Sequence, residues 1–362
     1  MPNSPLRAFA VHVVVCVLAV RGVRAQDQEP QWAGAAAAAL AAQIERDGIP
    51  GLSCAVAVGD RLPFRRGIGR ADVENDVPAS PQTVYRLASI SKPVTAVLAL
   101  QLAEAGALDL DADVASLVAD WPAKAWPVST RQLLGHLGGV RHYRGEAESV
   151  QVYATQRAGL VRFAADPLAH EPGSKYLYST YGFNLVGAVV EARAGVAFGE
   201  LVRTRIAEPC GAPTLQADDS RRLIRGRAQG YVRVDGVLRN SQPIDTSYKL
   251  AGGGLCSSAE DLARFAQALL AGRLLPPARM AAMWTEQTTR DGAGTGYGLG
   301  FAVAHKDGVQ VVAHSGSQAR VSTMLVLLPS AKVAVAVLCN LEGCKLAPVA
   351  EHIAALAAEG GK

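Results

Sequence analysis

The sequence has few charged residues and almost no charge imbalance. Charged side chains make up 19% of the 362 residues, and the formal net charge is +4. Three arginines lie among the first 25 residues, which hold no acid, so the rest of the chain carries 33 basic against 32 acidic side chains. Nucleic-acid binding requires a clustered basic face, and this balance gives no support for it. With 49% hydrophobic residues, the composition is that of an ordinary globular protein.

The apolar N-terminal segment is too short to cross a bilayer. Arg7 precedes a stretch of 13 mostly apolar residues, which is typical of the core of a signal peptide. Small residues follow at positions 23 and 25, so we predict that residues 1–25 are a signal peptide cleaved before Gln26. The protein is then exported, either to a periplasm or out of the cell, and keeps no stable membrane span. An uncleaved anchor is the alternative, and it exports the body of the protein as well.

The chain is also poor in cysteine. Cys16 is lost with the predicted signal peptide, and no C-x-x-C pair occurs among the cysteines that remain, which are Cys54, Cys210, Cys256, Cys339 and Cys344. This scattered spacing is not a disulfide framework. An oxidising compartment allows one or two bridges, but the spacing does not show which cysteines pair. We expect Cys256 to be a buried structural thiol.

The order of apolar patterns predicts an α+β fold. A helical pattern over residues 31–47 precedes a strand pair over residues 52–72, and helical patterns dominate residues 83–285. Short β runs with turn signals then follow from residue 298, and a helix over residues 346–359 closes the chain. We predict one antiparallel sheet built from both termini, flanked by the two terminal helices, with a large, mostly helical insert. Two separate domains divided near residue 285 are the alternative.

The segment "RLASISKPVTAVLAL", residues 86–100, places polar residues at the head of an apolar helix. Pro93 is tolerated in the first turn of a helix alone, so the helix is expected to begin at Ser89 or Ile90 and to end at Gly106. Residues three apart share a helix face, so Ser89 and Lys92 meet. A buried lysine has a lowered pKa and can take the proton of a serine hydroxyl. The alternative is that Ser89 caps the helix and Lys92 reaches solvent.

Two further motifs follow in order along the chain. Tyr178-Ser179-Thr180 lies just before a predicted helix, and His314-Ser315-Gly316 ends a β run. The series S-x-x-K, Tyr-Ser-x and His/Lys-Ser/Thr-Gly resembles the class C β-lactamase and D-Ala-D-Ala peptidase-related serine hydrolases. The similarity extends over residues 51–341. The phrases "RLASISKPVTA", "GVRHY", "YLYSTYG" and "DTSYKLAGGG" are especially similar to the mitochondrial serine β-lactamase-like proteins and their bacterial relatives.

This resemblance implies a role for each motif. Ser89 is the acylated nucleophile and Lys92 its activating partner. Tyr178 shares the proton and passes it to the leaving group, which requires a cation to lower its pKa from a usual value near 10. The backbone amides of Ser89 and Ser317 form the oxyanion hole.

The third motif and the end of the second are implied to contact the substrate. Ser315 belongs to the substrate-binding strand edge, and a side chain at Gly316 is expected to block the substrate from that edge.

Two positions depart from the family pattern. Thr180 stands where many relatives have Asn, so one amide contact to the substrate is lost or replaced. His314 stands where penicillin-recognising members carry Lys, and histidine is mostly neutral near pH 7. Recognition of a β-lactam or D-Ala carboxylate is therefore in doubt. Arg320 is a candidate substitute cation, although a solvated surface charge is its simpler interpretation. His136 and His142 are six residues apart, which suits no zinc motif, so we expect core or surface histidines.

The resemblance implies a β-lactamase/transpeptidase-like fold, with a single catalytic domain over residues 26–362. Its α/β part is residues 26–85 plus 286–362, and its helical part is residues 86–285. The expected activity is hydrolysis of amide bonds in peptides or small molecules through an acyl-enzyme, with no metal or other cofactor. A carboxylesterase or a β-lactamase is the alternative within the class. A non-catalytic binding or self-assembling protein is the alternative of another class, and a homo-oligomer remains open.

Overall fold

The computed structural model describes residues 29–145 and 150–360. The predicted signal peptide and its cleavage site lie outside the described residues. Within the described ranges, no helix is both long and apolar enough to cross a membrane.

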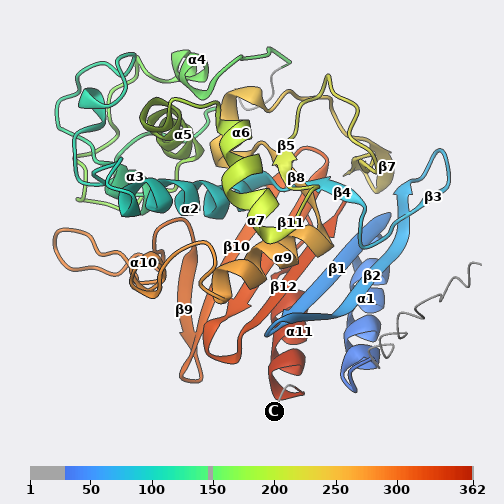
Figure 1. Cartoon of the computed structure of the whole chain (residues 1–362). Helices are drawn as coiled ribbons and strands as arrows, with labels where there is room; N and C mark the ends of the chain where they lie inside the picture. Colours follow the sequence, from blue (N-terminus) through green and yellow to red (C-terminus); the bar gives the residue numbers. More distant parts are fainter. Residues whose placement is uncertain (1–28, 146–149, 361–362) are drawn as a thin grey trace, which may run out of the picture.

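A seven-stranded antiparallel sheet joins the two ends of the chain, as predicted (Figure 1). Its order is β3-β2-β1-β12-β11-β10-β9. The strands are β1 (Gly51–Val58), β2 (Arg61–Asp72), β3 (Val77–Pro78), β9 (Ala302–Lys306), β10 (Val309–Gln318), β11 (Val321–Leu328) and β12 (Val333–Cys339). The N-terminal and C-terminal strands meet where β1 pairs with β12, from Leu52 opposite Cys339 to Val58 opposite Val333.

Both faces of this sheet are covered, which explains why β12 is apolar along its whole length. Alternate side chains of a strand point to opposite faces. The valines of β12 face α1 (Ala33–Asp47) and α11 (Ala347–Glu359), the two terminal helices. Ala334 and Ala336 face the other side, where α9 (Ala259–Leu270) packs on β1 and β12. Small side chains at these positions let the helix approach the sheet closely.

The middle of the chain forms the helical part, which lies over one end of the sheet (Figure 1). Its further helices are α2 (Ser91–Glu104), α3 (Thr130–Leu134), α4 (Gln156–Gly159), α5 (Thr180–Ala194), α6 (Phe198–Val202), α7 (Glu208–Cys210), α8 (Leu250–Gly253) and α10 (Pro277–Met283). The sequence patterns did not reveal its short strands, which are β4 (Val84–Arg86), β5 (Gln216–Ala217), β6 (Tyr231–Val234), β7 (Val237–Asn240) and β8 (Leu255–Ser258).

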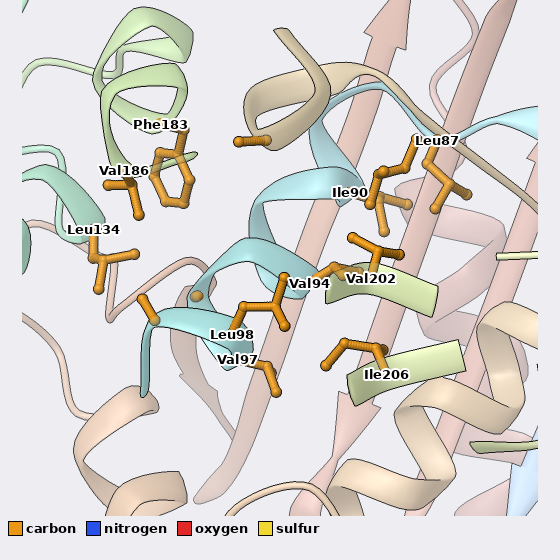
Figure 2. Packing of buried hydrophobic residues seen from close by; sticks show 14 of the residues in the cluster. Leu87, Ile90, Val94, Val97, Leu98, Leu134, Phe183, Val186, Val202 and Ile206 are labelled. Carbon is orange, nitrogen blue, oxygen red and sulfur yellow. The ribbon is translucent and has the colours of Figure 1, made fainter. Parts of the chain in front are cut away.

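Helix α2 runs through the centre of the helical part and is buried on nearly all sides. Figure 2 shows Val94, Val97 and Leu98 of α2 among apolar side chains of α3, α5 and the segment around α6. A helix that is apolar all round is typical of such a buried position. The functional consequence is that α2 is held against α5 and α8, while the turn before it contacts β10 and β11 of the sheet.

Candidate active site

Ser89 lies in a turn that precedes α2. This turn is the 3-10 helix η1 (Ala88–Ile90), and α2 begins at Ser91, one residue after the predicted start around Ser89 or Ile90. The hydroxyl of Ser91 explains the difference, because it donates to the carbonyl of Ala88 (2.8 Å) and accepts from the amide of Leu255 (3.1 Å). Ala88 has a φ of +48°, a conformation that costs an alanine roughly 1–3 kcal/mol. The turn leaves Ser89 half-buried beside a cavity.

Lys92 meets Ser89, as the spacing of three residues predicted. Its Nζ lies 3.0 Å from Oγ of Ser89, 3.1 Å from Oγ1 of Thr180 and 2.7 Å from the carbonyl oxygen of Gly252. The side chain is fully buried, and this burial, helped by the charge of Lys249, holds the pKa of Lys92 well below its usual value. A neutral amine has two N–H groups for Thr180 and Gly252, and it keeps a lone pair for the hydroxyl of Ser89.

Tyr178 also forms a hydrogen bond with Ser89, and it remains a protonated phenol. Burial raises the pKa of Tyr178, and a hydrogen bond with Ser89 offsets this effect in part. The cation that would have to lower this pKa is not supplied by Lys92, because burial holds Lys92 neutral. The Nζ of Lys92 lies 4.8 Å from the centroid of the Tyr178 ring.

Two histidines position the Tyr178-Ser179-Thr180 segment, a role that the sequence did not reveal. Nδ1 of His136 accepts a hydrogen bond from the amide of Ser179, and Nδ1 of His142 accepts one from the amide of Thr180, each at 3.1 Å. These two amides lie at the start of α5 and have no partner within the helix. The His136 ring also packs against Tyr178, with 4.3 Å between the ring centroids. The two histidines, which are six residues apart, therefore accept hydrogen bonds from the backbone amides of two adjacent residues.

The predicted substrate-binding edge belongs to β10. Strand β9 pairs with β10 only as far as Ala313, so the following residues of β10 border η1 instead. Ser315 and Ser317 are exposed on this segment and line the cavity. His314 also lines it, and burial together with the charge of Lys92 lowers the pKa of His314 to about 3. His314 is therefore neutral and supplies no cation to the site.

Gly316 serves a different purpose from the predicted one. A Cβ at this position would lie 2.2 Å from Oγ1 of Thr323, 2.4 Å from the carbonyl oxygen of Leu87 and 3.1 Å from Cβ of Ala88. Thr323 lies opposite Gly316 on the neighbouring strand β11, and Leu87 and Ala88 belong to the turn that carries Ser89. Gly316 thus lets the turn that carries Ser89 pack directly against β10.

One cavity of about 540 Å³ collects most of the predicted site residues. It is lined by Ser89, Tyr178, Thr180, His314, Ser315 and Ser317, whereas Lys92 lies beneath its surface. Tyr143, Tyr297 and Lys249 also line it. These three residues lie in or beside sequence phrases that resemble the family, but such phrases alone did not single them out.

Other candidate residues lie elsewhere. Arg320 is half-buried and is not among the residues that line the cavity, so it does not replace the missing cation of β10. Cys256 is buried in β8, as predicted. Across residues 29–145 and 150–360, no group of three or more His, Cys, Asp or Glu side chains could hold a metal ion.

The fold and the site define a serine hydrolase of the β-lactamase and penicillin-binding protein class. The Beta-lactamase family model matches residues 36–359, and the chain belongs to that family. It is 28% identical to the human mitochondrial serine beta-lactamase-like protein LACTB over 418 residues, an alignment that covers 85% of this chain and 76% of LACTB.

Two solved structures show the same fold. The octameric penicillin-binding protein homologue from Pyrococcus abyssi has a TM-score of 0.78 at 26% identity, and the match covers 91% of this chain and 77% of the homologue. The structure of SurE with D-Leu has a TM-score of 0.72 at 26% identity, with 91% of this chain and 75% of SurE covered. The predicted family and fold class are thereby confirmed.

Proposed function

We propose that this protein hydrolyses amide bonds through an acyl-enzyme formed on Ser89. The observation that carries the proposal is the 3.0 Å contact between the buried amine of Lys92 and the hydroxyl of Ser89. A serine hydroxyl becomes a useful nucleophile when a neighbouring base takes its proton. Lys92 meets this requirement, because burial keeps its amine neutral.

Acylation begins when Oγ of Ser89 attacks the carbonyl carbon of the substrate and its proton moves to Nζ of Lys92. The carbonyl oxygen becomes an oxyanion, which the backbone amides of Ser89 and Ser317 bind. Such a donor contributes about 10²- to 10³-fold in rate. The bond to the leaving nitrogen then breaks as Tyr178 donates its phenolic proton to that nitrogen, and the proton held by Lys92 afterwards restores the phenol of Tyr178.

Deacylation repeats these steps with water as the nucleophile. Water attacks the acyl carbonyl and gives its proton to the neutral amine of Lys92. The same two amides bind the second oxyanion. The bond to Oγ of Ser89 then breaks, Oγ regains a proton, and the free acid leaves.

Because Tyr178 stays protonated, it can donate a proton to the leaving group, and amide hydrolysis depends on this help more than ester hydrolysis does. An amine is a poor leaving group until its nitrogen is protonated, whereas an activated alcohol leaves more readily without that help. Burial keeps the Tyr178 phenol protonated beside Ser89. The similarity to SurE, whose structure was solved with D-Leu, supports amino-acid derivatives as the substrates.

A fluorophosphonate label tests the nucleophile directly. We expect the wild-type protein to be labelled at Ser89 and Ser89→Ala to remain unlabelled. Ser330→Ala is the matched control, because Ser330 is exposed and is not among the residues that line the cavity. Labelling of Ser89→Ala would remove Ser89 from this role. A folded wild-type protein that takes no label favours the non-catalytic binding alternative.

The substrate class is tested by comparing turnover of p-nitroanilides, p-nitrophenyl esters and nitrocefin. We expect measurable turnover of the anilides that disappears in Ser89→Ala. Turnover confined to esters would reassign the protein as a carboxylesterase.

Export is a second proposal, supported by the charge and apolar pattern of residues 1–25. Sequencing the N-terminus of the mature protein is expected to begin at Gln26. An intact N-terminus in a membrane fraction would show the uncleaved anchor instead.

A homo-oligomer is a third proposal, supported by the octameric state of the Pyrococcus abyssi homologue. Light scattering on the purified protein tests it, and a mass of one chain would reject it.

A further inference from the structure

One amine of the cavity has no part in the proposed chemistry. Lys249 lies at the end of the 3-10 helix η5 (Ser247–Lys249), directly before α8, and its side chain lines the same cavity as Ser89. Lys249 is 3% exposed. Lysine is almost never buried to this extent unless it is paired. Its position therefore requires an explanation.

Aromatic rings surround the amine of Lys249. Its Nζ lies 5.4 Å from the ring centroid of Tyr143 and 5.6 Å from that of Tyr248. Such contacts favour the cationic form of a lysine. The charged groups that act on it are Arg86 and Arg162, and both are positive. Within residues 29–145 and 150–360, no carboxylate, carbonyl or hydroxyl group accepts a hydrogen bond from this amine.

The rest of the described cavity lining supplies no competing charge. It contains no aspartate or glutamate, and Lys249 is its sole lysine or arginine. On the opposing β10 segment, His314 is neutral and its Nε2 is taken by Tyr297. An anion that enters the cavity thus finds one ammonium group with unused donors.

We infer that Lys249 binds a carboxylate group of the substrate, so that anionic amides are the preferred substrates. This inference rests on the proposed function, because it assigns a substrate class to the same site. A carboxylate satisfies the donors of the ammonium group through charge-assisted hydrogen bonds. It also offsets the repulsion from Arg86 and Arg162.

The pKa of Lys249 is consistent with binding of a carboxylate. Burial, followed by the charges of Arg86 and Arg162, lowers the pKa of Lys249 to about 7. The cation is thus costly in the empty cavity and is stabilised when an anion arrives. Lys249 also lowers the pKa of Lys92, so a role through Lys92 is the rival explanation that the test must exclude.

Two matched pairs of substrates test the inference and locate the carboxylate. Glutaryl p-nitroanilide and its neutral carboxamide analogue differ by a carboxylate in the acyl group, on the carbonyl side of the scissile bond. Acetyl-dialanine and its C-terminal amide differ by a carboxylate in the leaving group, on the nitrogen side of that bond. We expect the wild type to prefer the anion in at least one pair. In Lys249→Gln, we expect kcat/KM for that anion to fall about 10- to 100-fold further than kcat/KM for its neutral analogue.

The control variant is Lys175→Gln, because Lys175 is an exposed lysine next to the cavity residue Tyr176. We expect it to leave both pairs unchanged. Equal losses for the anionic and neutral substrates in Lys249→Gln would show that Lys249 acts through Lys92 or through the fold, and would overturn the inference. Unchanged kinetics in Lys249→Gln would overturn it as well.

A wild type that hydrolyses none of these compounds would contradict the proposed function and leave the binding site open to a direct test. Calorimetric titration with glutarate and with glutaramide then decides. Binding of glutarate alone, weakened at least tenfold in Lys249→Gln, supports the carboxylate site. Absence of glutarate binding to the wild type overturns it.

Discussion

The hydroxyl of Tyr297 lies 2.8 Å from Nε2 of His314, at the position where penicillin-recognising relatives carry a lysine. Nδ1 of the same ring lies 2.7 Å from the carbonyl oxygen of Ser315. A carbonyl oxygen only accepts, so Nδ1 holds the proton and Nε2 accepts from Tyr297. Both ring nitrogens of His314 are thus occupied within the protein.

This arrangement predicts weak turnover of β-lactams. Without a cation on β10, the carboxylate of nitrocefin loses a charge-assisted contact, which is worth about 10- to 100-fold in affinity. We expect kcat/KM for nitrocefin to be far below that for a p-nitrophenyl ester at every pH between 5 and 8. Rapid nitrocefin hydrolysis by the wild type, absent in Ser89→Ala, would show that His314 does not limit lactam recognition.

Replacing Lys92 by methionine is expected to change how stability depends on pH. The folded protein keeps this amine neutral, whereas the unfolded chain protonates it below its usual pKa of 10.5, so unfolding takes up a proton. Raising the pH therefore stabilises the wild type, by up to about 1.4 kcal/mol per pH unit for this group. Urea unfolding from pH 6 to pH 9 should show that Lys92→Met is more stable at pH 6 and that its advantage shrinks as pH rises.

The control is Lys175→Gln, which removes an exposed lysine and should follow the wild-type curve. A constant difference between Lys92→Met and the wild type across this range would mean that Lys92 is protonated in the folded protein. That result would also remove Lys92 as the base.

Much of the site geometry could be predicted because it depends on short-range rules. The three-residue spacing from Ser89 to Lys92 and the restriction on Pro93 locate both side chains at one end of α2. The consecutive short β runs joined by turns near the C-terminus likewise predicted an antiparallel sheet. Neither prediction depends on which other parts of the chain pack against these residues.

The remaining features depend on contacts between distant segments. His136 reaches the amide of Ser179 across 43 positions in the chain, and no spacing rule describes such a contact. The protonated state of Tyr178 follows from its burial, which the sequence does not show. Lys249 was unremarkable for the same reason, because an isolated lysine is usually exposed.

Tyr178→Phe is expected to impair amide hydrolysis more than ester hydrolysis. The variant removes the proton donor for the leaving nitrogen, a contribution of about 10²- to 10⁴-fold. Activated esters need less of that help, so their kcat should fall by a smaller factor. Steady-state kinetics on a p-nitroanilide and a p-nitrophenyl ester with the same acyl group measure both effects. Equal losses for the two substrates would assign Tyr178 to activation of Ser89 instead.

Gly316→Ala is expected to displace the turn that carries Ser89. The added Cβ would lie 2.4 Å from the carbonyl oxygen of Leu87 and 2.2 Å from Oγ1 of Thr323, so the backbone must move. Overpacking of this kind costs about 1–3 kcal/mol. We expect a lower free energy of unfolding together with slower fluorophosphonate labelling of Ser89. Gly34→Ala controls for glycine replacement as such, because an added Cβ at Gly34 meets no atom within 4 Å and its φ is not positive. Labelling at the wild-type rate in Gly316→Ala would show that the turn tolerates the shift.

Cys344 is expected to be the reactive thiol of the native protein. A hydrogen bond with Cys339 lowers the pKa of Cys344, and its side chain is partly exposed, so its thiolate forms at lower pH than that of an ordinary cysteine. Burial raises the pKa of the four other described cysteines, Cys54, Cys210, Cys256 and Cys339. Alkylation of the reduced, mature protein with N-ethylmaleimide should therefore modify one fast-reacting equivalent of thiol, which Cys344→Ser removes. Several fast equivalents, or one that survives Cys344→Ser, would contradict this assignment.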